Sequence, residues 1–158
     1  MTVKHARSYS SGPRSVVAQL RAANKKQVLQ ELAKRAAVMT GIHERTIYDV
    51  LIERERLGTT GIGMGIGIPH GRIPGLTKLY GLFVRLERPV PFEAIDEQPV
   101  DLVFLLLAPE TAGADHLKAL ALVSRLLRDR AICEKLRGTD NADALYVLLT
   151  DRTATHVA

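Results

Sequence analysis

The sequence predicts an α/β fold in a single domain, with helices on both faces of a sheet. The run from Val100 to Leu107 is almost continuously apolar, as in a strand that is covered on both sides. Apolar residues at helical spacing occur both before and after this run. The length of 158 residues suits one domain with its own hydrophobic core.

The first half of the domain is predicted to contain a strand and two helices. Alternating apolar residues over 15–20 predict a short strand. Asn24 is suited to cap a helix over 25–39, and a second helix over 44–57 should end at Gly58. The residues expected to be buried in these helices are Val28, Leu29, Leu32, Ala33, Ala36, Ile47, Val50, Leu51 and Leu57.

The segment over 61–71 is the most unusual part of the sequence, because glycine alternates with large apolar residues. The apolar members are Ile62, Met64, Ile66 and Ile68. If this segment is one extended strand, these four side chains share one face and the other face is bare backbone. We therefore expect one strand that packs on a single side and leads into Pro69 and His70.

The second half is predicted to contain two strands and three helices. A β-type run over 79–86 precedes the apolar run described above. Asp115 is placed to cap a helix over 116–128, a shorter helix follows over 132–136, and Asp140 should open the last helix. The inward residues expected are Leu117, Leu120, Ala121, Ser124, Leu127, Leu145, Leu148 and Leu149.

The domain should occupy residues 14–151, between a flexible segment over 1–13 and a flexible tail over 152–158. The formal net charge of +5 comes from the N-terminal end, since six of the 22 basic residues lie in the first 26 and no acidic residue does. The remainder carries 16 basic and 17 acidic residues, and the chain has no Trp. These features argue against nucleic-acid binding.

The sequence also argues against membrane insertion and secretion. No apolar run approaches the roughly 20 residues that span a bilayer, and no apolar stretch follows the basic N-terminus as in a signal peptide. Cys133 is the only cysteine, so the chain cannot form an internal disulfide. We therefore expect a cytoplasmic protein.

The spacing of residues in this sequence argues against several common kinds of functional site. The glycine-rich segment completes neither G-x-G-x-x-G nor a P-loop, which argues against nucleotide binding. The five histidines contain no pair at metal-ligand spacing, and no G-x-S-x-G motif supports a serine hydrolase. We expect no metal and no cofactor.

His70 is the candidate that remains, held between Pro69 and Gly71. Proline restricts the local backbone, and glycine leaves space beside the imidazole. An imidazole with an ordinary pKa of about 6.5 is largely neutral near pH 7, so one ring nitrogen has a lone pair that can attack phosphorus.

Arg54 and His116 are candidates to stabilise a phosphoryl group at His70. Arg54 lies seven residues after Ile47, on nearly the same side of its helix as the apolar stripe. It could instead be a snorkelling arginine or one paired with a surface acid. His116 lies at a helix start, where free N–H groups favour anions, although a histidine there can also be incidental.

Residues 54–71, RERLGTTGIGMGIGIPHG, resemble the active-site block of the enzyme IIA proteins of the phosphoenolpyruvate phosphotransferase system (PTS). Within that system they are most similar to the nitrogen-regulatory branch of the mannitol/fructose-type IIA domain. The resemblance continues through residues 92–102 and 115–120, and it covers about residues 15–150.

The resemblance implies that His70 is the phosphorylated residue and that Arg54 and His116 stabilise the phosphoryl group. It also implies a mixed, roughly five-stranded sheet and a small HPr-like phosphocarrier protein as the donor. Met64 stands where the family usually has Asn, and Gly67 where Ala is common. The loss of that Asn removes any polar contact it makes to the loop but leaves the histidine chemistry intact.

Three functions remain open. The first is a phosphorelay regulator whose phosphorylation state controls partners, for which the resemblance suggests transporter subunits or sensor kinases in nitrogen, potassium or carbon regulation. The second is a IIA component that passes phosphate to a separate sugar-specific IIB subunit. The third is an unphosphorylated protein-binding module. The absence of a fused IIB or IIC segment in this sequence favours the first. No turnover is expected from the isolated protein.

Overall fold

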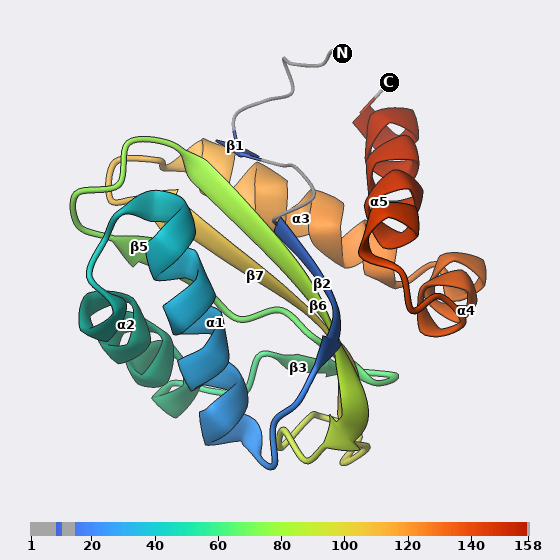
Figure 1. Cartoon of the computed structure of the whole chain (residues 1–158). Helices are drawn as coiled ribbons and strands as arrows, with labels where there is room; N and C mark the ends of the chain where they lie inside the picture. The colour runs from blue at the N-terminus through green and yellow to red at the C-terminus, as the bar shows by residue number, and fades with distance from the viewer. Residues whose placement is uncertain (1–8, 11–14, 158) are drawn as a thin grey trace.

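A mixed sheet lies between two layers of helices in the computed structural model, which describes residues 9–10 and 15–157 (Figure 1). The strands are β1 Tyr9–Ser10, β2 Val16–Leu20, β3 Gly61–Gly63, β4 Ile66–Gly67, β5 His70–Ile73, β6 Leu79–Val90 and β7 Val100–Pro109. The helices are α1 Lys25–Thr40, α2 Glu44–Arg56, α3 Ala114–Leu127, α4 Arg130–Arg137 and α5 Ala142–Val157.

Strands β6 and β7 form the centre of the sheet as an antiparallel pair. The strand order is β1-β6-β7-β4-β3, with β2 also paired to β6 and β5 also paired to β7. The pairings of β2 with β6 and of β4 and β5 with β7 are parallel. This confirms the expected mixed α/β sheet. Seven strands are found among the described residues. The glycine-rich segment contributes three short strands where we expected one, and Tyr9–Ser10 adds β1, which we did not expect.

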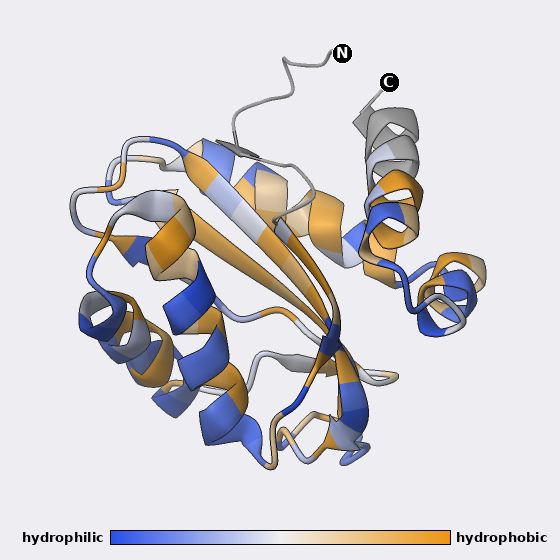
Figure 2. Ribbon diagram, in the orientation of Figure 1, coloured by the Kyte–Doolittle hydropathy of each residue, from blue (hydrophilic) through white to orange (hydrophobic). Residues whose placement is uncertain are grey.

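The two faces of the sheet pack into different cores. Val103, Leu105 and Leu107 of β7 pack with α1 and α2, whereas Leu102 packs with α3, α4 and α5. Figure 2 shows the apolar colouring that runs along the central strands and the inner sides of the helices. The strand is therefore covered on both faces, as its unbroken apolar run predicted.

The glycine-rich segment does not form one extended strand, and that expectation was wrong. β3 and β4 are an antiparallel pair joined by a tight turn. Met64 and Gly65 adopt positive φ values of 58° and 81° in that turn. The Met64 N–H donates to Asp96 Oδ2 at 2.9 Å, so a side chain 32 residues away holds the turn. Met64 is consequently exposed rather than aligned with the buried Ile66 and Ile68.

Helices α1 and α2 follow the prediction closely. The side chain of Asn24 accepts from the Gln27 N–H at 2.9 Å, and Gly41 takes up the left-handed conformation past the end of α1. All five residues predicted to be buried in α1 are buried. In α2, Ile47 and Leu51 are buried as expected and Val50 is half-buried. Leu57 is 80% exposed just after the last turn, so its predicted burial was wrong.

Helix α3 begins earlier than expected and presents a different face. Its N-cap is Gly113, so Asp115 lies in the first turn and does not cap it. The stripe that packs inward starts at His116 instead of Leu117, which is 65% exposed. The buried residues of α3 are His116, Ala119, Val123, Leu126 and Leu127.

Helix α4 is longer than the prediction, and α5 begins slightly later than expected. Asp129 caps α4 through its carboxylate. The Asn141 side chain accepts from the Ala144 N–H at 3.0 Å, so the last helix opens after Asn141 and not at Asp140. Leu145 and Leu149 are buried as expected.

The ends of the chain extend the expected domain. Helix α5 continues to Val157, past residue 151, where we expected the domain to end. Of the segment over 1–13, only Tyr9–Ser10 is described, as strand β1 beside β6, and the rest lies outside the described residues. Within the described part of the chain, no helix is long and apolar enough to cross a membrane.

Candidate functional site

The three predicted site residues meet beside strand β5. His70 opens β5 and pairs with Leu106 of β7. Among the described strands nothing pairs with the other side of β5, so this strand forms an edge of the sheet. Arg54 comes from the last turn of α2 and His116 from the first turn of α3. The sheet edge thus brings one residue from each helix layer to the same imidazole.

Two hydrogen bonds define the protonation of the His70 ring. Nδ1 lies 2.8 Å from the carbonyl oxygen of Ile68, which can only accept, so Nδ1 carries the hydrogen. Nε2 accepts from Arg54 Nε at 3.3 Å and therefore carries the lone pair. A neutral imidazole with a fixed tautomer that places its lone pair at Nε2 is a competent nucleophile once the Arg54 N–H gives way to the incoming group.

The surroundings of His70 also keep the ring neutral. Burial is the largest cause that lowers the pKa of His70, and the nearby Arg54 guanidinium lowers it further. The backbone carbonyl of Ile68 and the Glu55 carboxylate act in the opposite direction, but the net change is downward from the ordinary value. The lone pair of Nε2 is therefore available at neutral pH.

The Arg54 guanidinium is held in place at two points. Besides the contact to His70, Nη1 donates to the carbonyl oxygen of Gly58 at 2.9 Å, just past the end of α2. The surface ion pair in this turn is made instead by Arg56 with Glu53, at 3.1 Å. Arg54 is thus neither a snorkelling side chain nor the partner of a surface acid. Its Nη2 has no hydrogen-bond partner among the described residues and is free to bind an anion.

Gly71 allows α2 to approach β5. A Cβ atom at Gly71 would lie 2.5 Å from Cγ1 of Val50 on α2, far inside van der Waals contact. The glycine therefore permits the close packing that carries Arg54 to His70. The sequence predicts that Gly71 leaves space beside the imidazole, but it does not predict this contact with α2.

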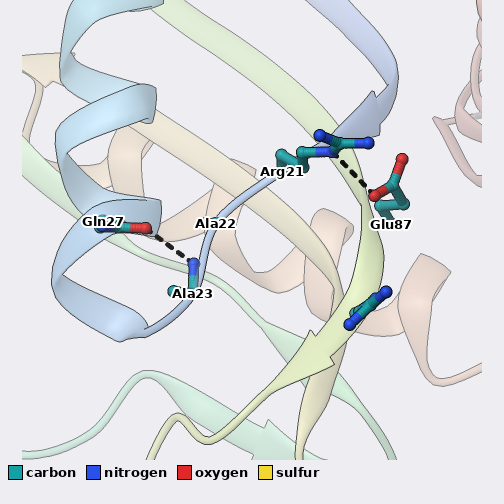
Figure 3. A pocket seen from close by; sticks show the side chains of 6 residues that line it. Arg21, Ala22, Ala23, Gln27 and Glu87 are labelled. Atoms are coloured by element: carbon teal, nitrogen blue, oxygen red, sulfur yellow. Dashed lines mark hydrogen bonds and ion pairs between the residues drawn. The ribbon is translucent and has the colours of Figure 1, made fainter.

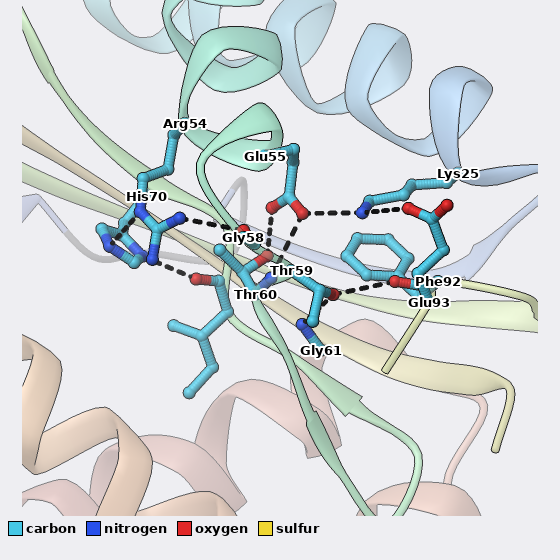
Figure 4. Close-up of polar contacts among 11 residues, drawn as sticks. Lys25, Arg54, Glu55, Gly58, Thr59, Thr60, Gly61, His70, Phe92 and Glu93 are labelled. Carbon is cyan, nitrogen blue, oxygen red and sulfur yellow. Dashed lines mark hydrogen bonds and ion pairs between the residues drawn. The ribbon is translucent and has the colours of Figure 1, made fainter. Parts of the chain in front are cut away.

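A buried carboxylate supports the loop behind the site (Figure 4). Glu55 accepts from both the backbone N–H and the hydroxyl of Thr60, and it lies 2.7 Å from Lys25 Nζ. The Thr60 carbonyl accepts from the Ile68 N–H at 2.9 Å, and the Ile68 carbonyl contacts His70. A continuous chain of polar contacts therefore runs from α1 to the imidazole. Neither Lys25 nor Glu55 was singled out from the sequence.

His116 is buried beside His70. The two ring centroids are 5.8 Å apart, with an edge-to-face angle of 67°. His116 is only 5% exposed, and its Nδ1 accepts from Arg72 Nε at 3.3 Å. Burial, followed by the charges of His70 and Arg72, lowers the pKa of His116. Its Nε2 is buried and has no hydrogen-bond partner among the described residues.

These residues line an open hollow of about 450 Å³. Its polar groups are those of Arg54, Arg72, His70, His116 and Glu53. Apolar side chains complete the wall, namely Val50, Leu57, Leu117 and Leu120. The arrangement joins a neutral nucleophile, two guanidinium groups and an unpaired N–H donor, which suits the binding and transfer of a phosphoryl group.

A second hollow, of about 490 Å³, lies elsewhere (Figure 3). It is next to the start of α1 and contains Arg88 and an ion pair of 3.0 Å between Arg21 and Glu87. His70 and Gly81 both pair with Leu106 of β7, from opposite sides. Glu87 is six residues after Gly81 on β6, so it lies about 20 Å away along the strand. This hollow contains no histidine, and the ion pair is largely exposed, so we do not assign the chemistry to it.

The fold is that of a PTS IIA protein, as the comparisons with known proteins show. The family model described as "Phosphoenolpyruvate-dependent sugar phosphotransferase system, EIIA 2" matches residues 12–152. The chain therefore belongs to the EIIA type 2 family of the phosphotransferase system.

Within this family the chain is similar to nitrogen regulatory proteins. It is 57% identical to the one from Bradyrhizobium diazoefficiens over 143 residues, which cover 90% of this chain and 94% of that protein. It is 41% identical to the one from Escherichia coli K12, over 84% of this chain and 82% of that protein. The crystal structure of the nitrogen regulatory protein IIA-Ntr from Neisseria meningitidis superposes with a TM-score of 0.83 and 32% identity, over 87% and 94% of the two chains. These relatives support a phosphocarrier or regulatory function.

Proposed function

We propose that His70 accepts a phosphoryl group at Nε2 from a phosphorylated HPr-like carrier, and that other proteins read the phosphorylation state. The observation that carries this proposal is the pair of contacts at the His70 ring. Nδ1 is held by the Ile68 carbonyl, and Nε2 faces the Arg54 guanidinium. The nucleophilic atom and the cation that would neutralise the incoming oxygens therefore face each other.

The transfer itself requires no proton to move at His70. The lone pair of Nε2 attacks phosphorus and forms a new N–P bond. The bond between phosphorus and the donor breaks, and its electron pair returns to the donor atom. Throughout this step the Nδ1–H keeps its hydrogen bond to the carbonyl of Ile68, at 2.8 Å in the free protein. The chain contributes positioning and electrostatic stabilisation, which are the main requirements of phosphoryl transfer.

Arg54 and His116 are proposed to bind the phosphoryl oxygens. The guanidinium of Arg54 has unpaired N–H groups beside Nε2 of His70. The buried Nε2 of His116 lacks a partner, and a phosphoryl oxygen would supply one. Charge-assisted hydrogen bonds of this kind are shorter and about twice as strong as neutral ones.

The donor is proposed to dock on the apolar wall of the hollow. Leu57 and Leu117 are 80% and 65% exposed, on either side of the site. Exposed leucines rimmed by charged residues are typical of protein–protein contact sites. Leu57 and Leu117, both of which we predicted to be buried, thus lie where a carrier protein would bind.

The phosphorylated protein would differ from the free form mainly by charge. A phosphoryl group adds up to about two negative charges at a site that now presents two arginines. A regulatory partner that contacts this surface would distinguish the two forms. We place this exchange in the cytoplasm, in keeping with the single, buried cysteine of the chain. The similarity to nitrogen regulatory proteins favours regulation. The candidate partners are those that the resemblance of the sequence implies, a transporter subunit or a sensor kinase.

Mass measurement of the intact protein tests the proposal. The protein is incubated at neutral pH with phosphoenolpyruvate, the first enzyme of the system and an HPr-like carrier. We expect the mass of one phosphoryl group, lost in acid and absent from His70→Ala. His43→Asn is the control, because it removes an exposed histidine and keeps a side-chain acceptor for the cap of α2. Full labelling of His70→Ala would refute the assignment.

Two further experiments, which use the same phosphorylated protein and the His70→Ala variant, distinguish the other two functions. A related fold is seen in the solved complex of the mannitol IIA protein from Escherichia coli with phosphorylated IIB, at a TM-score of 0.76 and 19% identity. Transfer of label to a cognate IIB protein would indicate that this chain also passes phosphate to a transporter subunit. A protein that takes up no phosphate, and whose partners bind wild type and His70→Ala equally, would be a binding module instead.

A further inference from the structure

Arg72 is the one cation of the hollow whose role the resemblance does not supply. It lies two residues after His70 on β5, and side chains two positions apart on a strand project from the same face. Its Nε donates to Nδ1 of His116 at 3.3 Å, across from β5 to α3. The contact therefore joins the sheet edge directly to the second imidazole of the site.

This hydrogen bond defines where His116 carries its hydrogen. Arginine stays protonated in proteins, so its Nε–H can only donate, and the Nδ1 that it contacts must carry a lone pair. The hydrogen of the neutral ring is then on Nε2. Without Arg72, either ring nitrogen of His116 could carry it.

The Nε2 of His116 is buried and unpaired among the described residues. Buried polar atoms without partners are uncommon in folded proteins, and an unpaired one indicates a missing ligand or a functional site. The ring stands edge-to-face to His70 at 5.8 Å. An oxygen of a phosphoryl group carried by His70 would lie between the two rings and accept the Nε2–H.

We propose that Arg72 is a positioning residue, which holds His116 as the Nε2–H tautomer so that this N–H donates to a phosphoryl group on His70. The inference rests on the proposed function of His70. It adds a role for a residue that makes its contribution through another side chain. The charge of Arg72 also helps to keep the His116 ring neutral, because it disfavours a second proton on that ring.

Two substitutions of matched length separate this role from the effect of charge. In Arg72→Gln, the amide nitrogen lies the same number of bonds from Cα as Nε of arginine, so the donor is kept and the charge is lost. In Arg72→Met, a methyl group takes that position, so donor and charge are both lost. Arg88→Met is the control, because it removes an exposed arginine at the second hollow.

The first measurement is ¹⁵N NMR of the His116 ring in the unphosphorylated protein, above pH 7. We expect a lone Nε2–H tautomer in wild type, Arg72→Gln and Arg88→Met, and two exchanging tautomers in Arg72→Met. A wild-type ring with its hydrogen on Nδ1, or an unchanged tautomer in Arg72→Met, would overturn the proposal. This readout needs no phosphate, so it remains decisive if the proposed function fails.

The second measurement is the equilibrium of phosphoryl exchange with the carrier. We expect Arg72→Met to shift the exchange toward the donor by about threefold to tenfold, as for partial loss of one hydrogen bond to a charged group. Arg72→Gln should recover most of this shift, and Arg88→Met should show none. If Arg72→Gln equals Arg72→Met while its tautomer is intact, Arg72 acts through charge alone and the positioning role is wrong.

Discussion

Arg54 and His70 lie 16 residues apart in the sequence and meet through a hydrogen bond of 3.3 Å between Nε and Nε2. The contact joins the end of α2 to the beginning of β5. The intervening loop is held by Glu55 through Thr60, so the distance between the two residues depends on groups that do not line the hollow.

Replacing Arg54 should slow phosphoryl uptake without unfolding the protein. Arg54→Gln removes the charge that faces Nε2 of His70 and the unpaired Nη2 donor, and loss of one preorganised donor at a reacting centre costs about 10²-fold in rate. The rate of labelling by the phosphorylated carrier, followed by intact mass, measures the effect. Arg56→Gln is the control, because Arg56 is an exposed arginine on the same helical turn that pairs with Glu53. Equal rates for Arg54→Gln and wild type would remove Arg54 from the site.

The fold was predictable because its main signals are local. The helix cap at Asn24 and the apolar stripe of α1 can be read within one turn or two of the chain. The unbroken apolar run of β7 indicates cover on both faces wherever the rest of the chain lies. His70 could be found for the same reason, since Pro69 and Gly71 are its direct neighbours.

The features that the sequence did not predict depend on distant contacts. The turn at Met64 is held by Asp96, 32 residues away, and an alternating pattern of glycine and isoleucine is equally compatible with one strand. The face that α3 buries is set by the packing of His116 beside β5, which an apolar stripe starting at Leu117 does not reveal. Arg72 carried no signal of its own except its position two residues after His70.

Gly71→Ala should separate α2 from β5. The added Cβ would lie 2.5 Å from Cγ1 of Val50, and overpacking of this kind costs about 1 to 3 kcal/mol. Because Arg54 is on the same helix as Val50, we expect slower phosphoryl uptake together with a lower midpoint of urea unfolding. The double variant Gly71→Ala/Val50→Ala makes room for the methyl group and should recover part of both losses. No recovery in the double variant would show that helix approach is not the reason for this glycine.

Breaking the buried ion pair behind the site should destabilise the fold. The Lys25 and Glu55 side chains are 15% and 7% exposed, and removing one partner of a buried pair leaves an uncompensated charge. We expect Lys25→Met to lower the free energy of unfolding by about 3 kcal/mol, measured by urea titration. Glu93→Gln is the control, because it removes the other carboxylate near Lys25, which is 83% exposed. Its effect should stay below about 1 kcal/mol. Similar losses for Lys25→Met and Glu93→Gln would contradict the importance of the buried pair.

The two histidines of the site should make the fold less stable as the pH falls below about 6.5. Burial lowers the pKa of both His70 and His116 in the folded protein, so the unfolded chain takes up protons first. Their contribution to stability is therefore fully present above the unfolded pKa of about 6.5 and is lost as the pH falls toward the lower folded values. Each group can change the free energy of unfolding by at most about 1.4 kcal/mol per pH unit in this window.

Urea unfolding between pH 7.5 and 5.5 measures this dependence, and these two pH values are roughly one unit on either side of the histidine pKa. The variant His70→Asn/His116→Asn should show a flatter slope than wild type, whatever its absolute stability. The Asp96 carboxyl does not contribute here, because the backbone N–H groups of Met64 and Gln98 lower its pKa further below this pH range. A double variant with the same slope as wild type would show that the folded protein does not resist protonation of these rings, and their neutrality at the site would then need another cause.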